Sequence, residues 1–153
     1  MNILEESDLQ SLSKLVPSVP YNEIQIGDCR SITKTITNED IVAFAKLTGD
    51  INPIHLDEEY AQQTHFKERI AHGLLTTSYI STVIGTKLPG KGAIYLSQHI
   101  RFKAPVKIGD TLTIIGKVIN KQDDKKIITL ETNVINQYNQ LVVEGQAVIM
   151  KME

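Results

Sequence analysis

The segment from Gly73 to Gly85 carries no charged side chain, and this feature most limits how the chain can fold. It is too long for a typical strand, so we interpret it as a buried helix. From Ile94 onward the chain instead alternates apolar and polar residues, with short turns between the alternating runs. This pattern predicts an antiparallel meander with one buried face. Together the two patterns predict an α+β fold in which an antiparallel sheet wraps around a central helix.

The individual strands can be assigned from the same alternation. Residues 29–37 are rich in isoleucine and threonine, which favour strands, so a first strand is expected there. Turns are expected at residues 109–110, 123–126 and 138–140. The positions expected on the buried face are Ile94, Leu96, Ile100, Phe102, Leu112, Ile114, Val118, Ile128, Leu130, Thr132, Val134, Val143, Gly145, Ala147 and Ile149.

Length, charge and cysteine content limit the function classes. The 153 residues suit one domain with a full-sized core. A formal net charge of -2 argues against a nucleic-acid partner, because few phosphates would be neutralised. The single cysteine, Cys29, excludes an intramolecular disulfide and a multi-cysteine zinc site. The acidic N-terminus does not resemble a signal peptide, and no apolar run approaches the length that crosses a bilayer. We therefore expect a soluble, cytoplasmic protein with no membrane partner.

Residues 1–22 are expected to form an appendage to a main domain at residues 23–153. Leu9, Leu12 and Val16 have helical spacing after Ser7, a candidate cap, so a short helix is predicted. Prolines at positions 17 and 20 end it. We expect this helix to pack on the surface of the domain, and an interface or regulatory role is the alternative.

A second helix is expected just before the residues that carry chemistry. Thr37 followed by Asp40 resembles a capping box, and Gly49 is well placed to end the helix. The residues from Asp50 to His55 follow directly, and Pro53 among them lacks the backbone donor that a regular helix needs. We therefore expect an irregular loop there, anchored by the preceding helix.

Asp50 and His55 share this short loop, which suits the hydration of a double bond conjugated to a thioester. A neutral imidazole can take a proton from water near neutral pH. The Asp50 carboxylate can orient the same water and pass on the second proton. A structural role as a cap, a turn or a solvated surface pair is the alternative for two such residues. His55, Asp50 and His72 lack the spacing of a metal site, so no metal is expected.

The stretch Ala71-His72-Gly73 opens the uncharged helix, and it offers a site for negative charge. The first N–H groups of a helix lack partners and favour an anion. Glycine lets a ligand approach the backbone, so the Gly73 N–H is a candidate donor to an oxyanion. From the residues alone, His72 is more simply structural, and Ser81 is more simply a serine bonded to its own helix.

The residues from Phe44 to His55, with Ala61 beyond them, resemble the hydratase 2 signature of the MaoC-like dehydratase family. Ala71-His72-Gly73 and the stretch from Leu88 to Asp110 are also similar to the (R)-specific enoyl-CoA hydratases of that family. The resemblance covers residues 26–150. It implies a hot-dog fold, a homodimer, no cofactor, and syn addition of water to a trans-2-enoyl-CoA that gives the (R)-3-hydroxyacyl-CoA.

The resemblance also assigns roles to single residues. Asp50 and His55 would be the catalytic dyad, and the Gly73 N–H would bind the thioester oxygen. Supporting roles are implied for Asn52, Ser81 and His72. Such an enzyme supplies hydroxyacyl units for polyester synthesis or runs as a dehydratase, and chain length and carrier stay open.

An acyl chain would need an apolar tunnel, and the CoA phosphates would need cations. Leu74, Leu75, Ile80 and Val83 are candidates for the tunnel, although core packing explains them equally well. Arg101, Lys103 and Lys91 are candidates for the phosphates, and a solvated surface role explains each of these cations as well.

Two other functions stay open. A hot-dog acyl-CoA thioesterase typically uses an acidic residue on the central helix, and residues 73–85 contain none. A non-enzymatic acyl-CoA-binding protein would not need Asp50 and His55 together.

Overall fold

The computed structural model describes residues 4–152 of the chain. One long helix and a five-stranded sheet form its centre, and short helices precede them. The main elements are α1 (Glu6–Ser13), β1 (Cys29–Thr35), α2 (Asn38–Thr48), α3 (Pro53–Leu56), α4 (Glu58–Gln63), α5 (Gly73–Thr86), β2 (Ala93–Phe102), β3 (Thr111–Gln122), β4 (Ile127–Ile135) and β5 (Leu141–Lys151).

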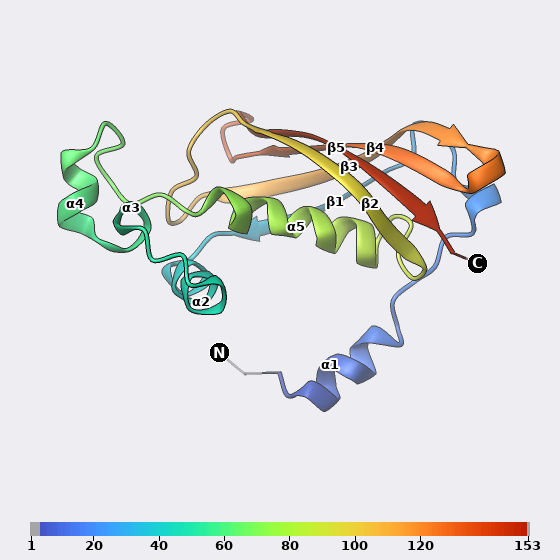
Figure 1. Cartoon of the computed structure of the whole chain (residues 1–153), viewed down its shortest axis with the longest axis horizontal. Helices are drawn as coiled ribbons and strands as arrows, with labels where there is room; N and C mark the ends of the chain where they lie inside the picture. The colour runs from blue at the N-terminus through green and yellow to red at the C-terminus, as the bar shows by residue number, and fades with distance from the viewer. Residues whose placement is uncertain (1–3, 153) are drawn as a thin grey trace.

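The sheet wraps around α5, as the sequence predicted. Its strand order is β1-β3-β4-β5-β2, and all neighbouring strands are antiparallel. Figure 1 shows α5 running along one face of the sheet, with α2, α3 and α4 gathered at one end. Leu75, Ile80, Val83 and Ile84 of α5 belong to the same buried cluster as the inward side chains of the strands. This is a hot-dog arrangement, so the predicted α+β class is confirmed.

Alternation along β3, β4 and β5 places the expected side chains in the core. The buried positions include Leu112, Ile114, Val118, Ile128, Leu130, Val134, Val143, Ala147 and Ile149. Burying a side chain of this size contributes roughly 1.5–3 kcal/mol, so these strands supply much of the stability of the fold.

Strand β2 departs from the prediction at two positions. Leu96 is 49% exposed, because the pairing of β2 with β5 shifts between Tyr95 and Ser97 and leaves Leu96 as the bulged residue. Phe102 is 56% exposed although Val143, its partner on β5, is buried. It lies at the end of β2, where its ring covers the first residue of α5. The prediction of a buried Leu96 and a buried Phe102 was therefore wrong.

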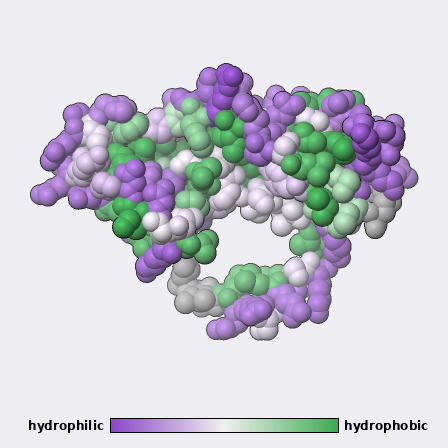
Figure 2. Space-filling view, viewed as in Figure 1, coloured by the Kyte–Doolittle hydropathy of each residue, from purple (hydrophilic) through white to green (hydrophobic). Residues whose placement is uncertain are grey.

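Helix α1 lies within the predicted appendage and does not pack on the domain. None of the residues of α1 is buried, and Leu9 and Leu12 are both at least half exposed. Figures 1 and 2 show α1 standing away from the rest of the molecule, with open space between them. Its cap is Glu5, which exchanges bonds with Asp8, and the candidate cap Ser7 lies inside the helix. Residues 1–3 of the predicted appendage lie outside the described residues.

The connection from α1 to the domain is held by backbone bonds. Ser18 pairs with Gly90, and the Val19 N–H donates to the Pro89 carbonyl oxygen at 2.9 Å. Tyr21 and Ile24 are then buried in the core, so the chain is anchored just before β1. Among residues 4–152 no helix combines the length and the apolar character that a membrane span requires.

Candidate active site

Helix α2 ends at Gly49, directly before Asp50. Its start is capped by Thr37 and Asp40, as predicted, and Gly49 ends it in the left-handed conformation with φ of 80°. A residue with a Cβ adopts this conformation only with strain, so glycine suits the turn that leads out of the helix. Asp50 therefore follows a well-defined helix C-cap and not a flexible linker.

The segment after Asp50 is a short helix, and the prediction of an irregular loop was wrong. Helix α3 (Pro53–Leu56) begins with Pro53 at its first position, where no backbone donor is needed. Asn52 caps it, because its side-chain oxygen accepts a bond from the Ile54 N–H at 3.3 Å. The Asp50 side chain in turn accepts from the Asn52 N–H at 3.2 Å. These bonds fix the backbone between Asp50 and His55.

The hydrogen bonds of His55 define which of its nitrogens carries the proton. Its Nδ1 lies 2.8 Å from the Ile70 carbonyl oxygen, which can only accept, so Nδ1 donates. Nε2 is then left as a proton acceptor in the neutral ring. Burial lowers the pKa of His55 from its ordinary value of 6.5, against a raising effect of the Ile70 bond. The electrostatic interaction with His72 also lowers this pKa, while that with Asp50 raises it. A neutral imidazole at pH 7 is the form that a general base requires.

His72 lies against both residues of the predicted dyad. Its ring is only 2% exposed and stacks on the His55 ring, with 3.9 Å between the ring centroids. Its Nε2 donates to the backbone carbonyl oxygen of Asp50 at 3.0 Å, so it holds the aspartate in place. His72 also packs against Phe44 of α2, with the ring centroids 4.8 Å apart. One buried residue therefore contacts both members of the predicted dyad.

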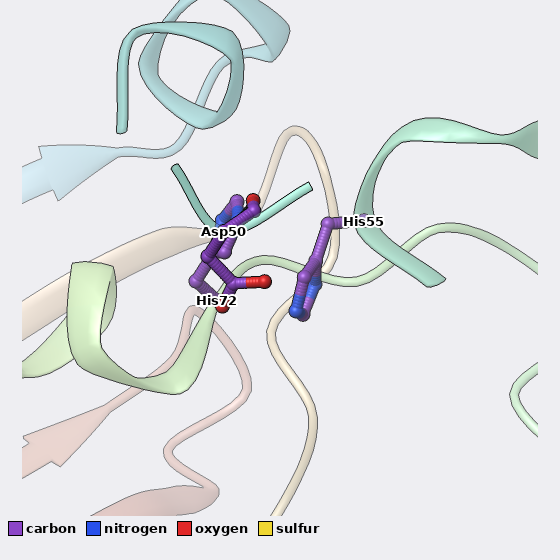
Figure 3. A group of neighbouring side chains, drawn as sticks. All are labelled: Asp50, His55 and His72. Carbon is purple, nitrogen blue, oxygen red and sulfur yellow. Dashed lines mark hydrogen bonds between the residues drawn. The ribbon is translucent and has the colours of Figure 1, made fainter. Parts of the chain in front are cut away.

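The structure brings Asp50, His55 and His72 together. One nitrogen or carboxylate oxygen of each residue lies within 4.8 Å of the corresponding atoms of the other two. Figure 3 shows the Asp50 carboxylate pointing toward the His55 ring. His55 and His72 each use one ring nitrogen for a hydrogen bond to a backbone carbonyl oxygen. Of the groups that remain, the Asp50 carboxylate and the Nε2 of His55 can hold one water molecule between them.

A largely apolar cavity of about 430 Å³ adjoins His55. Gly73, the first residue of α5, lines it, so the unpaired N–H groups of the helix start lie at its wall. A Cβ on Gly73 would lie 2.7 Å from the ring of Phe102, so any larger residue would push that ring. The lining residues are His55, Phe66, Ile70, Ala71, Gly73, Thr76, Phe102, Lys103, Ala104, Pro105 and Val106.

The other predicted site residues are distributed differently. Leu75, Ile80 and Val83 are core residues, and Leu74 is exposed, so none of the four lines this cavity. Ser81 is exposed on α5, eight residues beyond Gly73, which is about 12 Å along the helix axis.

Of the three cations suggested for phosphate binding, only Lys103 lines the cavity. Arg101 faces a separate hollow formed by β2 to β5. The backbone N–H of Lys91 bonds to Pro17, near the far end of α5.

Sequence reasoning did not identify the residues that hold the dyad from a distance. Arg69 donates from Nε to the His55 carbonyl oxygen at 2.7 Å, and from Nη2 to Asn38 at 2.8 Å. It ties α3 to the start of α2. An arginine placed shortly before the Ala71-His72-Gly73 stretch was the only signal available, and it does not reveal a backbone partner.

The fold and the site together define a hot-dog protein with a neutral imidazole and a carboxylate beside an apolar cavity at a helix N-terminus. The family model described as MaoC like domain matches residues 25–140, and the chain belongs to that family.

Several relatives support this membership. An (R)-specific enoyl-CoA hydratase from Rhodospirillum rubrum is 47% identical over 130 residues, which cover 85% of this chain and 90% of that protein. Its counterpart from Aeromonas caviae is 40% identical and covers 82% and 94% of the two chains. The R-hydratase PhaJ1 from Pseudomonas aeruginosa has a solved structure with a TM-score of 0.86 and 46% identity. This match covers 90% of this chain and 88% of that one.

Proposed function

We propose that this protein is an (R)-specific enoyl-CoA hydratase, a hydro-lyase that adds water to a trans-2-enoyl-CoA or removes it from the product. The observation that carries the proposal is the pairing of the Asp50 carboxylate with a neutral His55 beside an apolar cavity. The relatives named as (R)-specific enoyl-CoA hydratases and a 3-hydroxybutyryl-CoA dehydratase from Methylorubrum extorquens, which is 40% identical, support it.

The proposed chemistry begins with a water held between Asp50 and His55. His55 Nε2 takes a proton from this water as the oxygen bonds to C3 of the enoyl group. The electron pair of the double bond moves toward the thioester and leaves an enolate. The protonated His55 then gives this proton to the Asp50 carboxylate, which delivers it to C2, so both groups end in their starting state. Because both groups lie on one side of the substrate, hydroxyl and proton add to the same face.

Gly73 is the proposed donor to the thioester oxygen. The backbone N–H groups at the start of α5 have no partner within the helix, and the helix dipole favours the negative charge of the enolate there. The absence of a Cβ at Gly73 leaves room for the Phe102 ring, which lies beside the start of α5 at the cavity wall. Asn52 and His72 would keep Asp50 and His55 in position through the bonds described above.

The substrate carrier is proposed to be CoA. Lys103 lines the cavity and offers a cation for the phosphates of CoA. A mitochondrial 3-hydroxyacyl-[acyl-carrier-protein] dehydratase from Arabidopsis thaliana is 35% identical over 127 residues, so an acyl carrier protein is the competing carrier. The (R)-hydratase of known structure from Aeromonas caviae is involved in polyhydroxyalkanoate biosynthesis, and we propose the same supply of hydroxyacyl units here.

We further propose a homodimer with the appendage (residues 1–22) attached to a single domain (residues 23–153). Strand β2 lies at one edge of the sheet, and Tyr95, Leu96 and Phe102 on it are exposed. Pairing this edge with a second copy would cover unpaired backbone groups and apolar side chains. Sedimentation of the purified protein tests the oligomeric state, and a monomer at micromolar concentration contradicts it.

The test of the activity is direct. Purified protein mixed with crotonyl-CoA should remove the ultraviolet absorbance of the enoyl thioester, and no free thiol should appear. Release of free thiol would identify a thioesterase, and binding without either change would identify an acyl-CoA-binding protein. Both results overturn the proposal.

A further inference from the structure

Thr76 carries a buried hydroxyl group that nothing in the proposed chemistry has used. The residue is 1% exposed, and its Oγ1 has no hydrogen-bond partner among the residues that the structure describes. Leaving a buried hydroxyl unpaired costs on the order of 1–3 kcal/mol, so such a group is uncommon. Its neighbours Thr77 and Ser78 instead donate to Leu74 and Leu75 of their own helix, at 3.1 Å and 2.6 Å.

The position of Thr76 relates this hydroxyl to the substrate cavity. Thr76 and Gly73 both line the cavity, and residues three apart on a helix share one face. Side chains on a helix lean toward its N-terminus, so the Thr76 side chain lies over the turn that begins at Gly73. Apart from His55, Lys103 and Thr76 itself, the side chains that line the cavity are apolar. A ligand oxygen bound at the Gly73 N–H would therefore have the Thr76 side chain beside it.

We propose that Thr76 is a second catalytic donor, whose hydroxyl hydrogen-bonds the thioester oxygen together with the Gly73 N–H. The ligand is the acyl thioester itself, and the proposal rests on the proposed function. As the double bond accepts the water oxygen, negative charge grows on the thioester oxygen, and a second donor stabilises it in a site with little water. The hydroxyl is unpaired in the free protein because its partner arrives with the substrate.

Thr76→Val tests this assignment, because valine has the shape of threonine and lacks the hydroxyl. The kcat for crotonyl-CoA should fall about 100-fold, the usual effect of removing one donor to an oxyanion. Thr76→Ser, which keeps a hydroxyl, should recover most of the rate. Thr77→Val is the matched control, since Thr77 is also buried on α5 but bonds to Leu74 and does not line the cavity.

Two further measurements separate this role from a structural one. The Tm of Thr76→Val should rise, because the variant no longer buries an unpaired polar group, whereas activity falls. Acetoacetyl-CoA serves as a probe that does not turn over: donors to its thioester oxygen increase the absorbance of the bound enolate. Thr76→Val should lower this enolate absorbance at constant pH, and Thr77→Val should leave it at the wild-type value.

Each outcome decides the assignment. Wild-type kcat and enolate absorbance in Thr76→Val overturn it and leave the hydratase proposal intact. A loss of activity with a lower Tm and an unchanged enolate signal also overturns it, since the hydroxyl would then serve the fold. If the wild type fails to hydrate crotonyl-CoA, the proposed function falls, and the enolate measurement still decides on Thr76. A wild type that does not bind acetoacetyl-CoA overturns both.

Discussion

The strands β3 to β5 and the segment from α2 to α4 are built on different principles. The strands bury alternate side chains so completely that Ile114, Leu130 and Val134 have no exposed area. The helical segment holds Asp50 and His55, and it buries little besides Ile41, Ala45 and Ala61. Polar bonds fix it instead, among them those from Asn52, Arg69 and His72.

This difference separates stability from chemistry. The burial of apolar side chains contributes strongly to stability and does not depend on direction, so it suits a scaffold. Hydrogen bonds are directional, so they suit groups that must hold a water molecule in one geometry. Substitutions in the strands should therefore change the free energy of unfolding, and substitutions in the helical segment should change turnover.

The largest effect is expected at the dyad. Asp50→Asn and His55→Gln each remove an acid–base group and keep the approximate shape of the side chain. Each should lower kcat for crotonyl-CoA by about 100-fold or more, with a Tm near that of the wild type. Near-normal turnover in either variant would remove that residue from the chemistry.

The strands should respond in the opposite way. Leu130→Ala leaves a hole in the core and should cost about 2–5 kcal/mol of unfolding free energy, as measured by urea denaturation. The kcat of the molecules that remain folded should stay close to that of the wild type. Leu47→Ala on α2 is the control, because Leu47 is exposed and should barely change the denaturation midpoint. An unchanged urea denaturation midpoint in Leu130→Ala would show that the strands do not supply most of the stability.

Arg69 gives a smaller and more specific effect. Arg69→Gln loses the bond to the His55 carbonyl and the link to Asn38, so α3 should shift relative to α2. Turnover should fall by about 10-fold, since small misplacements of catalytic groups are costly, while the KM changes less. Arg101→Gln, which removes an exposed arginine from β2, should leave kcat unchanged. Equal kinetics in the two variants would exclude a positioning role for Arg69.

The pH dependence should be the mildest effect. Burial lowers the pKa of His55, so the folded protein keeps the ring neutral below the ordinary value of 6.5. The acidic limb of kcat/KM should therefore have its midpoint below pH 6.5. In the window between the lowered pKa and 6.5, the unfolded chain binds more protons than the folded one, so stability falls as the pH falls. His55→Gln should lose this part of the pH dependence, and a midpoint of kcat/KM above 6.5 would contradict the assignment.

The parts of this structure that local patterns control could be predicted from the sequence. The caps of α2 at Thr37 and Gly49, the start of α5 and the alternation in β3 to β5 all follow from neighbouring residues. Asp50 and His55 were candidates because both lie on one short segment, and their role as a dyad came from the resemblance of residues 44–55 to the hydratase 2 signature. The helix α3 was missed because Pro53 has opposite effects at the first position of a helix and inside one.

The contacts that complete the site could not be predicted in this way. The stacking of His72 on His55 and the bond from Arg69 to His55 join residues 14 or more positions apart. Arg69 and His72 donate to backbone carbonyl oxygens, and every residue has such an oxygen, so the partner cannot be inferred from residue identity. The exposure of Leu96 depends on a bulge that only the pairing of β2 with β5 reveals.

The most direct test of the shared water is the stereochemistry of its addition. Hydration of trans-crotonyl-CoA in D2O should give (R)-3-hydroxybutyryl-CoA with one deuterium at C2, on the same face as the new hydroxyl group. Addition to one face is required if Asp50 and His55 act from one side of the substrate. Deuterium on the opposite face would contradict a single water held between the two side chains, and the (S) product would contradict the (R)-specific assignment.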